Sequence, residues 1–359
     1  MRNVMMQPDS AVYNFPPSPL GDTSRLNKYL DYVYLLGDPH LGKKFVTGVP
    51  LNRRGDREQM QRDQFEDEVI GIKPGRHFHV CMGDLFDKFT VDNKWVDFAY
   101  ETYRQASLQN PSVEYIIIQG NHDASRDKAL TSSFQIFAKM CSGLKNVTVL
   151  TKHPIFKQHQ GLNFLFVPWV PFQTTSELLD LEFPILGKPR HSPFAAFGHW
   201  DTKSYGEEEC DNLIPFDHFD YDCCEGIVTG HYHKPERIVV KNQEIFITGS
   251  MQPYAHGEER GDKKDPMYLT HSRQEVLDFL ETNKDYYKNK VLRVVLDDDE
   301  PALAEINCLA LTHTKTKILN NDANVDVEVD SFNLEEIFNS VMKEKGVTAD
   351  LTQELWGQL

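Results

Sequence analysis

Five short motifs in this chain bring together side chains that bind divalent metal ions. In chain order they are Asp38-Pro39-His40, Gly83-Asp84-Leu85-Phe86-Asp87, Gly120-Asn121-His122-Asp123, Gly198-His199 and Gly230-His231-Tyr232-His233. A mixed set of nitrogen and oxygen donors suits Mn²⁺, Fe²⁺ or Zn²⁺ better than Mg²⁺, which prefers oxygen ligands and water. Two ions that share a carboxylate, about 3.5–4 Å apart, activate a water and clamp phosphoryl oxygens. The motifs therefore predict phosphate-ester hydrolysis at a two-metal centre, with Asp84 as the bridge.

An apolar run rich in β-forming residues precedes each motif. The five runs are Tyr32–Leu36, His79–Met82, Tyr115–Ile118, Phe194–Phe197 and Ile227–Thr229, and each is typical of a buried strand. In open layered sheets, reacting groups gather beyond the carboxyl ends of the strands. We therefore expect five strand ends to converge on one site.

Each motif taken alone has an ordinary structural explanation. An isolated Asp-x-His or Gly-His pair is common, and a buried histidine is more often hydrogen-bonded than bound to metal. The combination is more specific, because all five motifs occur in one chain and each follows a predicted strand. Their order favours a metal site over five unrelated structural residues.

In this order the motifs resemble those of the calcineurin-like metallophosphoesterase superfamily, over roughly residues 30–255. The segment Ile245-Phe246-Ile247-Thr248-Gly249-Ser250, followed by Gly257-Glu258-Glu259, is similar to the strand and turn that close the phosphoesterase domain of SbcD-type DNA nucleases. The resemblance implies an α/β fold: a four-layer sandwich of two mixed β-sheets flanked by helices. We expect an N-terminal extension (1–30), the phosphoesterase domain (31–260), a small α+β capping domain (261–330) that presents DNA, and a C-terminal helical segment (331–359).

The resemblance also implies a role for each site residue. One metal would be held by Asp38, His40, Asp84 and His233, and the other by Asp84, Asn121, His199 and His231. His122 would contact the scissile phosphate and protonate the leaving oxygen, since imidazole exchanges protons near neutral pH. We expect Asp123 to orient that ring and Asp87 to support a metal ligand from behind. The alternative for His122 is a structural neighbour of Asn121.

The function implied by the resemblance is a Mn²⁺-dependent DNA nuclease, acting as an exonuclease on double strands, an endonuclease on single strands, or both. Mn²⁺ is the favoured ion of the two sites, with Mg²⁺, Fe²⁺ or Zn²⁺ as alternatives. Its partner would be an SMC-like ATPase of the SbcC type, with the nuclease as a homodimer, in DNA recombination, repair and replication. Phages encode compact versions of such enzymes. Two other hypotheses remain: a free-standing phosphatase or small-molecule phosphodiesterase, and a scaffold that keeps its metals without using them.

The net charge of −16 argues at first against a DNA-binding protein, because cations drive phosphate binding. However, residues 293–359 hold 14 acidic and 5 basic residues, a net charge of −9. A basic stretch follows the first ligand pair and could contact a DNA backbone: Lys43, Lys44, Arg53, Arg54, Arg57 and Arg62. Since Asp56, Glu58 and Asp63 are interleaved with it, an ordinary solvated loop is the alternative.

Composition sets the remaining limits. The sequence has no apolar run long enough to span a membrane and no apolar signal region near Met1, so we expect a cytoplasmic protein, in the host cell if it is phage-encoded. The six scattered cysteines are typical of reduced, mostly buried thiols, although Cys223-Cys224 could also be a redox pair. Near the C-terminus, Leu334, Phe338 and Met342 belong to an apolar helical face that could dock on an ATPase partner or pack on its own domain.

Overall fold

A computed structural model of the protein describes residues 16–72, 77–186, 192–202, 212–219, 223–259, 265–304 and 306–315. Half of the predicted N-terminal extension (1–15) and the whole predicted C-terminal helical segment (331–359) lie outside the described residues. None of the helices in the described ranges has the length and apolar character that crossing a bilayer requires.

The first sheet carries the first three motifs. Its strands are β1 (Val33–Leu36), β2 (Phe78–Cys81), β3 (Glu114–Ile118) and β4 (Val147–Leu150), in that spatial order and all parallel. Helices α2 (Asp56–Ile70), α3 (Asn93–Gln109) and α4 (Ser133–Cys141) connect successive strands, because parallel neighbours need a crossover connection. The prediction of two mixed sheets is therefore wrong for this sheet, whose described strands are entirely parallel.

The second sheet is mixed. It contains β5 (Ile155–His159), β6 (Leu162–Phe166), β7 (Phe194–Gly198), β8 (Cys224–Thr229), β9 (Glu236–Val240) and β10 (Gln243–Ile247), in the order β5-β6-β7-β8-β10-β9. Short hairpins make the two edge pairs antiparallel, while β6, β7, β8 and β10 run parallel. Helix α5 (Thr175–Leu186) follows β6. The shorter helices are η1 (Gly21–Thr23), α1 (Asn27–Leu30), η2 (Leu51–Arg53) and η3 (Phe216–His218).

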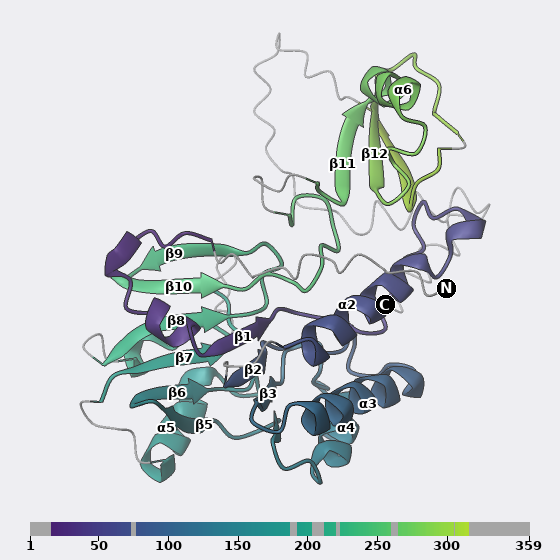
Figure 1. The fold of residues 1–359 in the computed structure, drawn as a ribbon. Helices are drawn as coiled ribbons and strands as arrows, with labels where there is room; N and C mark the ends of the chain where they lie inside the picture. The colour runs from purple at the N-terminus through teal and green to yellow at the C-terminus, as the bar shows by residue number, and fades with distance from the viewer. Residues whose placement is uncertain are drawn as a thin grey trace, which may run out of the picture. The chain divides into compact units, whose positions relative to one another are not determined.

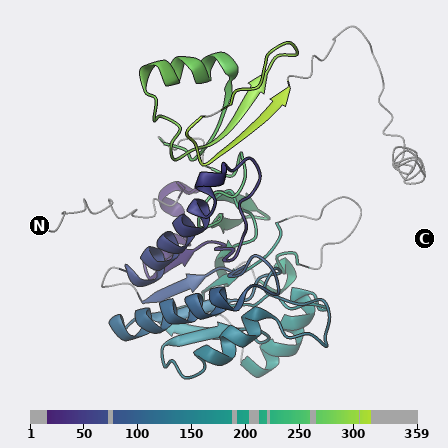
Figure 2. The ribbon, with the colours of Figure 1, turned by 90° about the vertical axis from the view of Figure 1, so that its right-hand side faces the viewer.

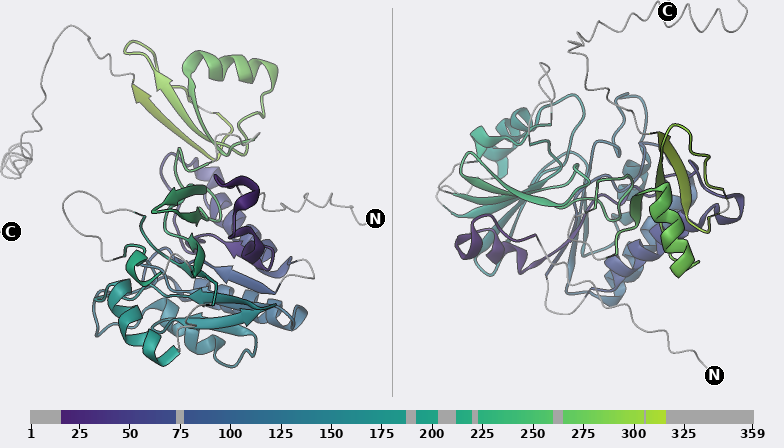
Figure 3. Two further views of the ribbon diagram at one scale, coloured as in Figure 1. Left: turned by 90° about the vertical axis from the view of Figure 1, so that its left-hand side faces the viewer. Right: turned by 90° about the horizontal axis from the view of Figure 1, so that it is seen from above.

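Three apolar cores hold these elements as layers. Along β3, Tyr115 and Ile117 pack with α2, α3 and α4, whereas Ile116 and Ile118 face the second sheet, as the two-residue period of a strand requires. The other face of the second sheet packs on α5 through Leu179. Figure 1 shows α2, α3 and α4 on one side of β1–β3 and the second sheet on the other, and Figure 3 shows that sheet and α5 from further sides. The predicted α/β sandwich is confirmed.

A third, smaller sheet lies near the end of the described chain. It consists of β11 (Tyr268–Ser272), β12 (Val291–Leu296) and β13 (Ala310–Lys315), all parallel. Helix α6 (Arg273–Thr282) connects β11 to β12 (Figure 2). It begins with a capping box between Ser272 and Glu275. Val276 and Leu292 belong to its own core.

Candidate metal centre

The ligands predicted from the sequence stand at the carboxyl ends of five parallel strands. Asp38 and His40 follow β1, Asp84 follows β2, and Asn121 follows β3. From the second sheet, His199 follows β7, while His231 and His233 follow β8. The chain beyond β10 closes the site, since Ser250 forms a bridge with Asp38 and the Met251 N–H donates to the Asp38 carbonyl at 3.1 Å.

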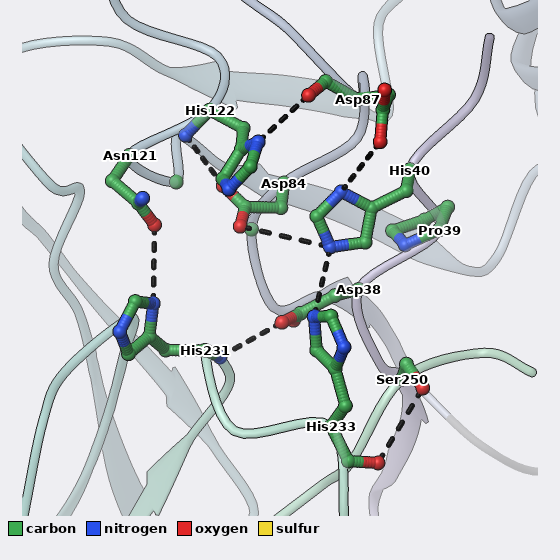
Figure 4. A network of polar contacts seen from close by, with 12 residues as sticks. Asp38, Pro39, His40, Asp84, Asp87, Asn121, His122, His231, His233 and Ser250 are labelled. Atoms are coloured by element: carbon green, nitrogen blue, oxygen red, sulfur yellow. Dashed lines mark hydrogen bonds and ion pairs between the residues drawn. The ribbon is translucent and has the colours of Figure 1, made fainter. Parts of the chain in front are cut away.

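The first set of ligands meets around His40. Its Nε2 lies 3.0 Å from Nε2 of His233 and 3.9 Å from Oδ2 of Asp84 (Figure 4). Asp38, His40 and His233 each offer one ligand atom within 4.8 Å of the others. These side chains are those predicted for one metal ion.

The second set meets around His199. Its Nε2 lies 3.3 Å from Oδ2 of Asp84 and 2.9 Å from Oδ1 of Asn121. The same Asn121 oxygen lies 3.1 Å from Nδ1 of His231. Because Oδ2 of Asp84 faces Nε2 of both His40, at 3.9 Å, and His199, at 3.3 Å, it is placed to bridge two ions.

Each histidine in the two sets has its other ring nitrogen against an oxygen atom. The His199 Nδ1 donates to the Met82 carbonyl at 2.9 Å, and the His231 Nε2 lies 3.0 Å from Asp201 Oδ1. The remaining two nitrogens face carboxylates, at 3.0 Å for His233 Nδ1 to Glu258 Oε1 and 3.8 Å for His40 Nδ1 to Asp87 Oδ1. Such partners fix the ring and its tautomer so that the other nitrogen faces the metal.

Two of these supporting residues were missed as site residues by the sequence reasoning. Asp201 stands two residues after His199, and Glu258 lies in the Gly-Glu-Glu segment after β10. Neither spacing indicates a contact, because each depends on how a loop folds back. Asp87 lies where predicted, behind His40.

The site has buried polar atoms that a cation would satisfy. Asp38, Asp84 and His199 are at most 1% exposed. The Asp38 Oδ1 has no hydrogen-bond partner among the described residues, and two imidazole nitrogens face each other across 3.0 Å. Leaving buried polar groups unsatisfied is costly. A divalent ion between these atoms fits the donor set.

The electrostatics point the same way. Burial raises the pKa of Asp38 to about 6, against the opposing effect of His199. Burial alone would lower the pKa of His199, but Asp84 and Asp38 raise it to about 10. Burial lowers the pKa of His40 to about 3, so its ring is neutral with a free lone pair. Asp84 and Asp38 thus favour a positive charge beside them, which the binding of a metal cation also requires.

Comparison with known proteins decides the family. The model of the calcineurin-like phosphoesterase family matches residues 32–235, more than half of the chain. The chain belongs to this family. Membership implies a metal-dependent hydrolase of phosphate esters, and the clusters around Asp84 are the side chains that could hold its metals.

Comparisons with curated proteins and with solved structures give no further assignment. No curated protein matches the chain. Among solved structures, a Thermus thermophilus protein, TT1561, is 10% identical with a TM-score of 0.40, covering 62% of this chain and 90% of its own. A Staphylococcus aureus protein assigned as a 5′-nucleotidase is 15% identical, with a TM-score of 0.36. The match covers 61% of this chain and 48% of the Staphylococcus aureus chain. GAP50, the anchor in the inner membrane complex of Plasmodium, is 12% identical, with a TM-score of 0.39. The match covers 65% of this chain and 75% of GAP50.

In this phosphoesterase, His122 lies at the exposed side of the ligand cluster. Its ring centre is 4.9 Å from that of His40, and its Nδ1 donates to the Asp87 carbonyl at 2.7 Å. Its backbone N–H donates to Asp84 Oδ1 at 2.8 Å, which holds the bridging carboxylate (Figure 4). The ring therefore stands beside the metal site and is oriented by a backbone carbonyl.

Asp123 differs from its predicted role. Its carboxylate is fully buried and accepts hydrogen bonds from the backbone N–H groups of Leu85, Phe86 and Gly120 at 2.9–3.2 Å. It therefore fixes the two loops that carry Asp84 and Asn121 rather than orienting the His122 ring. The sequence could not distinguish these roles, because adjacent residues on a turn point in different directions.

Three site residues of the phosphoesterase occupy the left-handed backbone region. The φ angles are 47° for His40, 48° for Asp84 and 77° for His231. Such conformations cost about 1–3 kcal/mol each in non-glycine residues and cluster at functional sites. Neighbouring Gly83 has a φ of 118°, and a Cβ there would collide with the His199 ring. The loops are therefore strained to bring their ligands together.

The basic stretch is only partly available to DNA. Arg57 is 2% exposed, and its guanidinium donates to Gln252, Pro253 and Tyr268, so the prediction that it contacts DNA is wrong. The Arg53 guanidinium binds Asp56 and Asn307. Lys43 lies 3.2 Å from Asp87, at the metal site. Lys44 and Arg54 are exposed.

Proposed function

We propose that this phosphoesterase is a Mn²⁺-dependent DNA nuclease of the SbcD type. The main support is the place of the segment after β10, on which the resemblance to those nucleases depends. In this segment Ser250 bridges to Asp38, and Glu258 contacts His233. The distinguishing part of the sequence therefore belongs to the metal centre and not to a remote surface.

The chain's own residues account for much of the proposed chemistry. Two divalent ions, when bound, supply an activated water and neutralise charge on the phosphoryl group. Asp84 and the surrounding ligands hold them at the strand ends. Because the Nδ1 of His122 donates to the Asp87 carbonyl, its Nε2 is the nitrogen that can hold a proton for the leaving oxygen.

Exposed cations on the ligand loops support a polyanionic substrate. They follow β1, β2, β3 and β8, and they are Lys44, Lys88, Arg126, Lys128 and Lys234. Side chains of this kind contact backbone phosphates without reading the base sequence. A nuclease needs such contacts on both sides of the scissile bond, whereas a small-molecule phosphodiesterase does not.

The test compares DNA with a small ester. The purified protein is incubated in Mn²⁺ with end-labelled single- and double-stranded DNA and with a nitrophenyl phosphodiester. We expect DNA cleavage, and we expect His122→Ala to lower kcat by about 10²–10⁴-fold through loss of the proton donor, with Mn²⁺ binding retained. His153→Ala is the matched control, since His153 is an exposed histidine paired with Glu182.

Three results would change the proposal. Hydrolysis of the small ester with DNA left intact would favour the free-standing phosphodiesterase. Full DNA cleavage by His122→Ala would remove His122 from the mechanism while leaving the nuclease in place. Metal binding without hydrolysis of either substrate would favour the scaffold.

We further propose that the protein works in the cytoplasm as a homodimer with an SMC-like ATPase in DNA recombination, repair and replication. The support is the resemblance of its sequence to SbcD-type subunits. Residues 331–359 are the segment proposed to dock on the ATPase. Deleting them should abolish capture of the ATPase and leave hydrolysis of the small ester intact; unchanged capture would contradict this assignment.

A further inference from the structure

Glu258 is tied both to a metal ligand and to its own turn. Its Oε1 lies 3.0 Å from the His233 Nδ1. Its Oε2 accepts hydrogen bonds from the backbone N–H groups of Tyr254, at 2.6 Å, and Ala255, at 3.1 Å. Although burial alone would raise the pKa of Glu258, His233 and these N–H groups lower it, so the carboxylate is ionised. The His233 ring is therefore held by a carboxylate that is itself fixed by two backbone N–H donors.

The next residue in the chain is fixed to the third sheet. The Glu259 carboxylate accepts hydrogen bonds from the backbone N–H groups of Met267, at 2.9 Å, and Tyr268, at 2.7 Å. Tyr268 is the first residue of β11. Two adjacent carboxylates thus connect the start of this sheet to a metal ligand, with one peptide unit between them.

The turn that carries Glu258 also contacts the first ligand loop. The Tyr254 hydroxyl donates to the Pro39 carbonyl, and its ring lies 5.2 Å from that of His40. The buried Arg57 donates to the Pro253 carbonyl at 3.1 Å and to the Tyr268 hydroxyl at 3.2 Å. The turn is therefore fixed by contacts with both the first ligand loop and Tyr268 of β11.

We infer that Glu258 is a positioning residue for His233, and that Glu259 makes the affinity of the Asp38/His40/His233 metal site depend on the sheet β11–β13. A shift of β11 moves Glu259, and Glu258 must follow because it is the adjacent residue. The His233 ring then changes its orientation, so that its Nε2 no longer faces the Nε2 of His40. The inference rests on the metal centre and not on DNA as the substrate.

The test is a Mn²⁺ titration of the full-length protein, in which the two ions bind as separate events. Glu258→Ala should weaken one event by about 10–100-fold, the usual effect of losing a partner behind a metal-bound histidine. Glu259→Ala should weaken the same event in the same direction. The other event, at Asn121, His199 and His231, should stay unchanged, which a general loss of stability would not allow.

Glu275→Ala is the matched control. Glu275 is also a carboxylate that accepts a backbone N–H of β11, but at the far end of the strand, at Ser272. Its loss should leave both metal-binding events unchanged. Should Glu259→Ala fail to fold by circular dichroism, Glu259→Gln keeps the size of the side chain and replaces one of its two acceptors with a donor.

The double variant tests the route of the effect. If Glu259 acts through Glu258, adding Glu259→Ala to Glu258→Ala should give no further loss of affinity. Additive losses would overturn the inference, as would Glu259 variants with normal binding of both ions, or equal weakening of both events. Because no DNA is used, these results are independent of the proposed nuclease activity.

Discussion

At the scale of single residues, the site depends on one oxygen atom. Oδ2 of Asp84 lies within 3.9 Å of His40 Nε2 and 3.3 Å of His199 Nε2, while Oδ1 is held by the His122 N–H. Burial would raise the pKa of Asp84, but the surrounding histidines lower it below its usual range. The carboxylate is therefore ionised, and its Oδ2 is the oxygen that can bind both metal ions.

Replacing Asp84 should affect both metal ions together. Asp84→Asn keeps the size of the side chain but removes the charge, so we expect the protein to lose affinity for both ions and its phosphoesterase activity to fall to background. The measurement is metal content after gel filtration, with hydrolysis of the small ester alongside. Asp92→Asn is the control, because Asn caps a helix about as well as the Asp92 that caps α3. Retention of one full equivalent of metal by Asp84→Asn would contradict a bridging role.

At the scale of elements, the glycines in the turns after the strands are packed too closely for a larger residue to replace them. We predict that Gly83→Ala lowers the thermal unfolding midpoint and weakens metal binding, since its φ of 118° is strained for alanine and its Cβ would meet the His199 ring. Gly143→Ala is the matched control: a Cβ there meets nothing within 4 Å. It should be neutral or stabilising by about 0.4–1 kcal/mol. Equal midpoints for both variants would refute this account of the turn.

Helix α2 contains a carboxyl group that should make stability depend on pH. Burial, helped by Asp67, raises the pKa of Glu68 from 4.5 to about 7. Protonated Glu68 is favoured in the folded state, so its contribution is fully present below about pH 4.5 and is lost as pH rises through about 7. Glu68→Gln should therefore resemble the parent at pH 4.5 and be the more stable of the two at pH 8, in urea unfolding with a chelator present. A constant difference between the two proteins across this range would argue against it.

The sequence was most informative where a strand ended in a ligand. The predicted run Phe194–Phe197 lies within β7, and the run at Ile227–Thr229 ends β8 at its last residue. Buried strands and their terminal glycines have local signals. The supports of the site have none, because Asp201 and Glu258 reach their histidines only after the loops fold back. For the same reason the sequence could not show that Arg57 is buried or that Asp123 binds backbone N–H groups.

At the scale of the whole molecule, metal binding and folding should be linked. The ligands come from two sheets that share the core between them, so an ion that binds all of them stabilises only the folded chain. Free Mn²⁺ at 100 times its dissociation constant should add about 2.7 kcal/mol to the free energy of unfolding. Thermal unfolding with Mn²⁺ and with a chelator measures this difference. An unchanged midpoint would mean that the ions bind weakly or outside this cluster.

Anomalous scattering from a crystal grown with Mn²⁺ locates the metal ions bound to this site. We predict two peaks about 3.5–4 Å apart, both coordinated by Oδ2 of Asp84. One peak should also contact His40 and His233, and the other His199 and His231. A single peak, or two peaks without a shared Asp84 oxygen, would contradict a two-metal phosphoesterase centre.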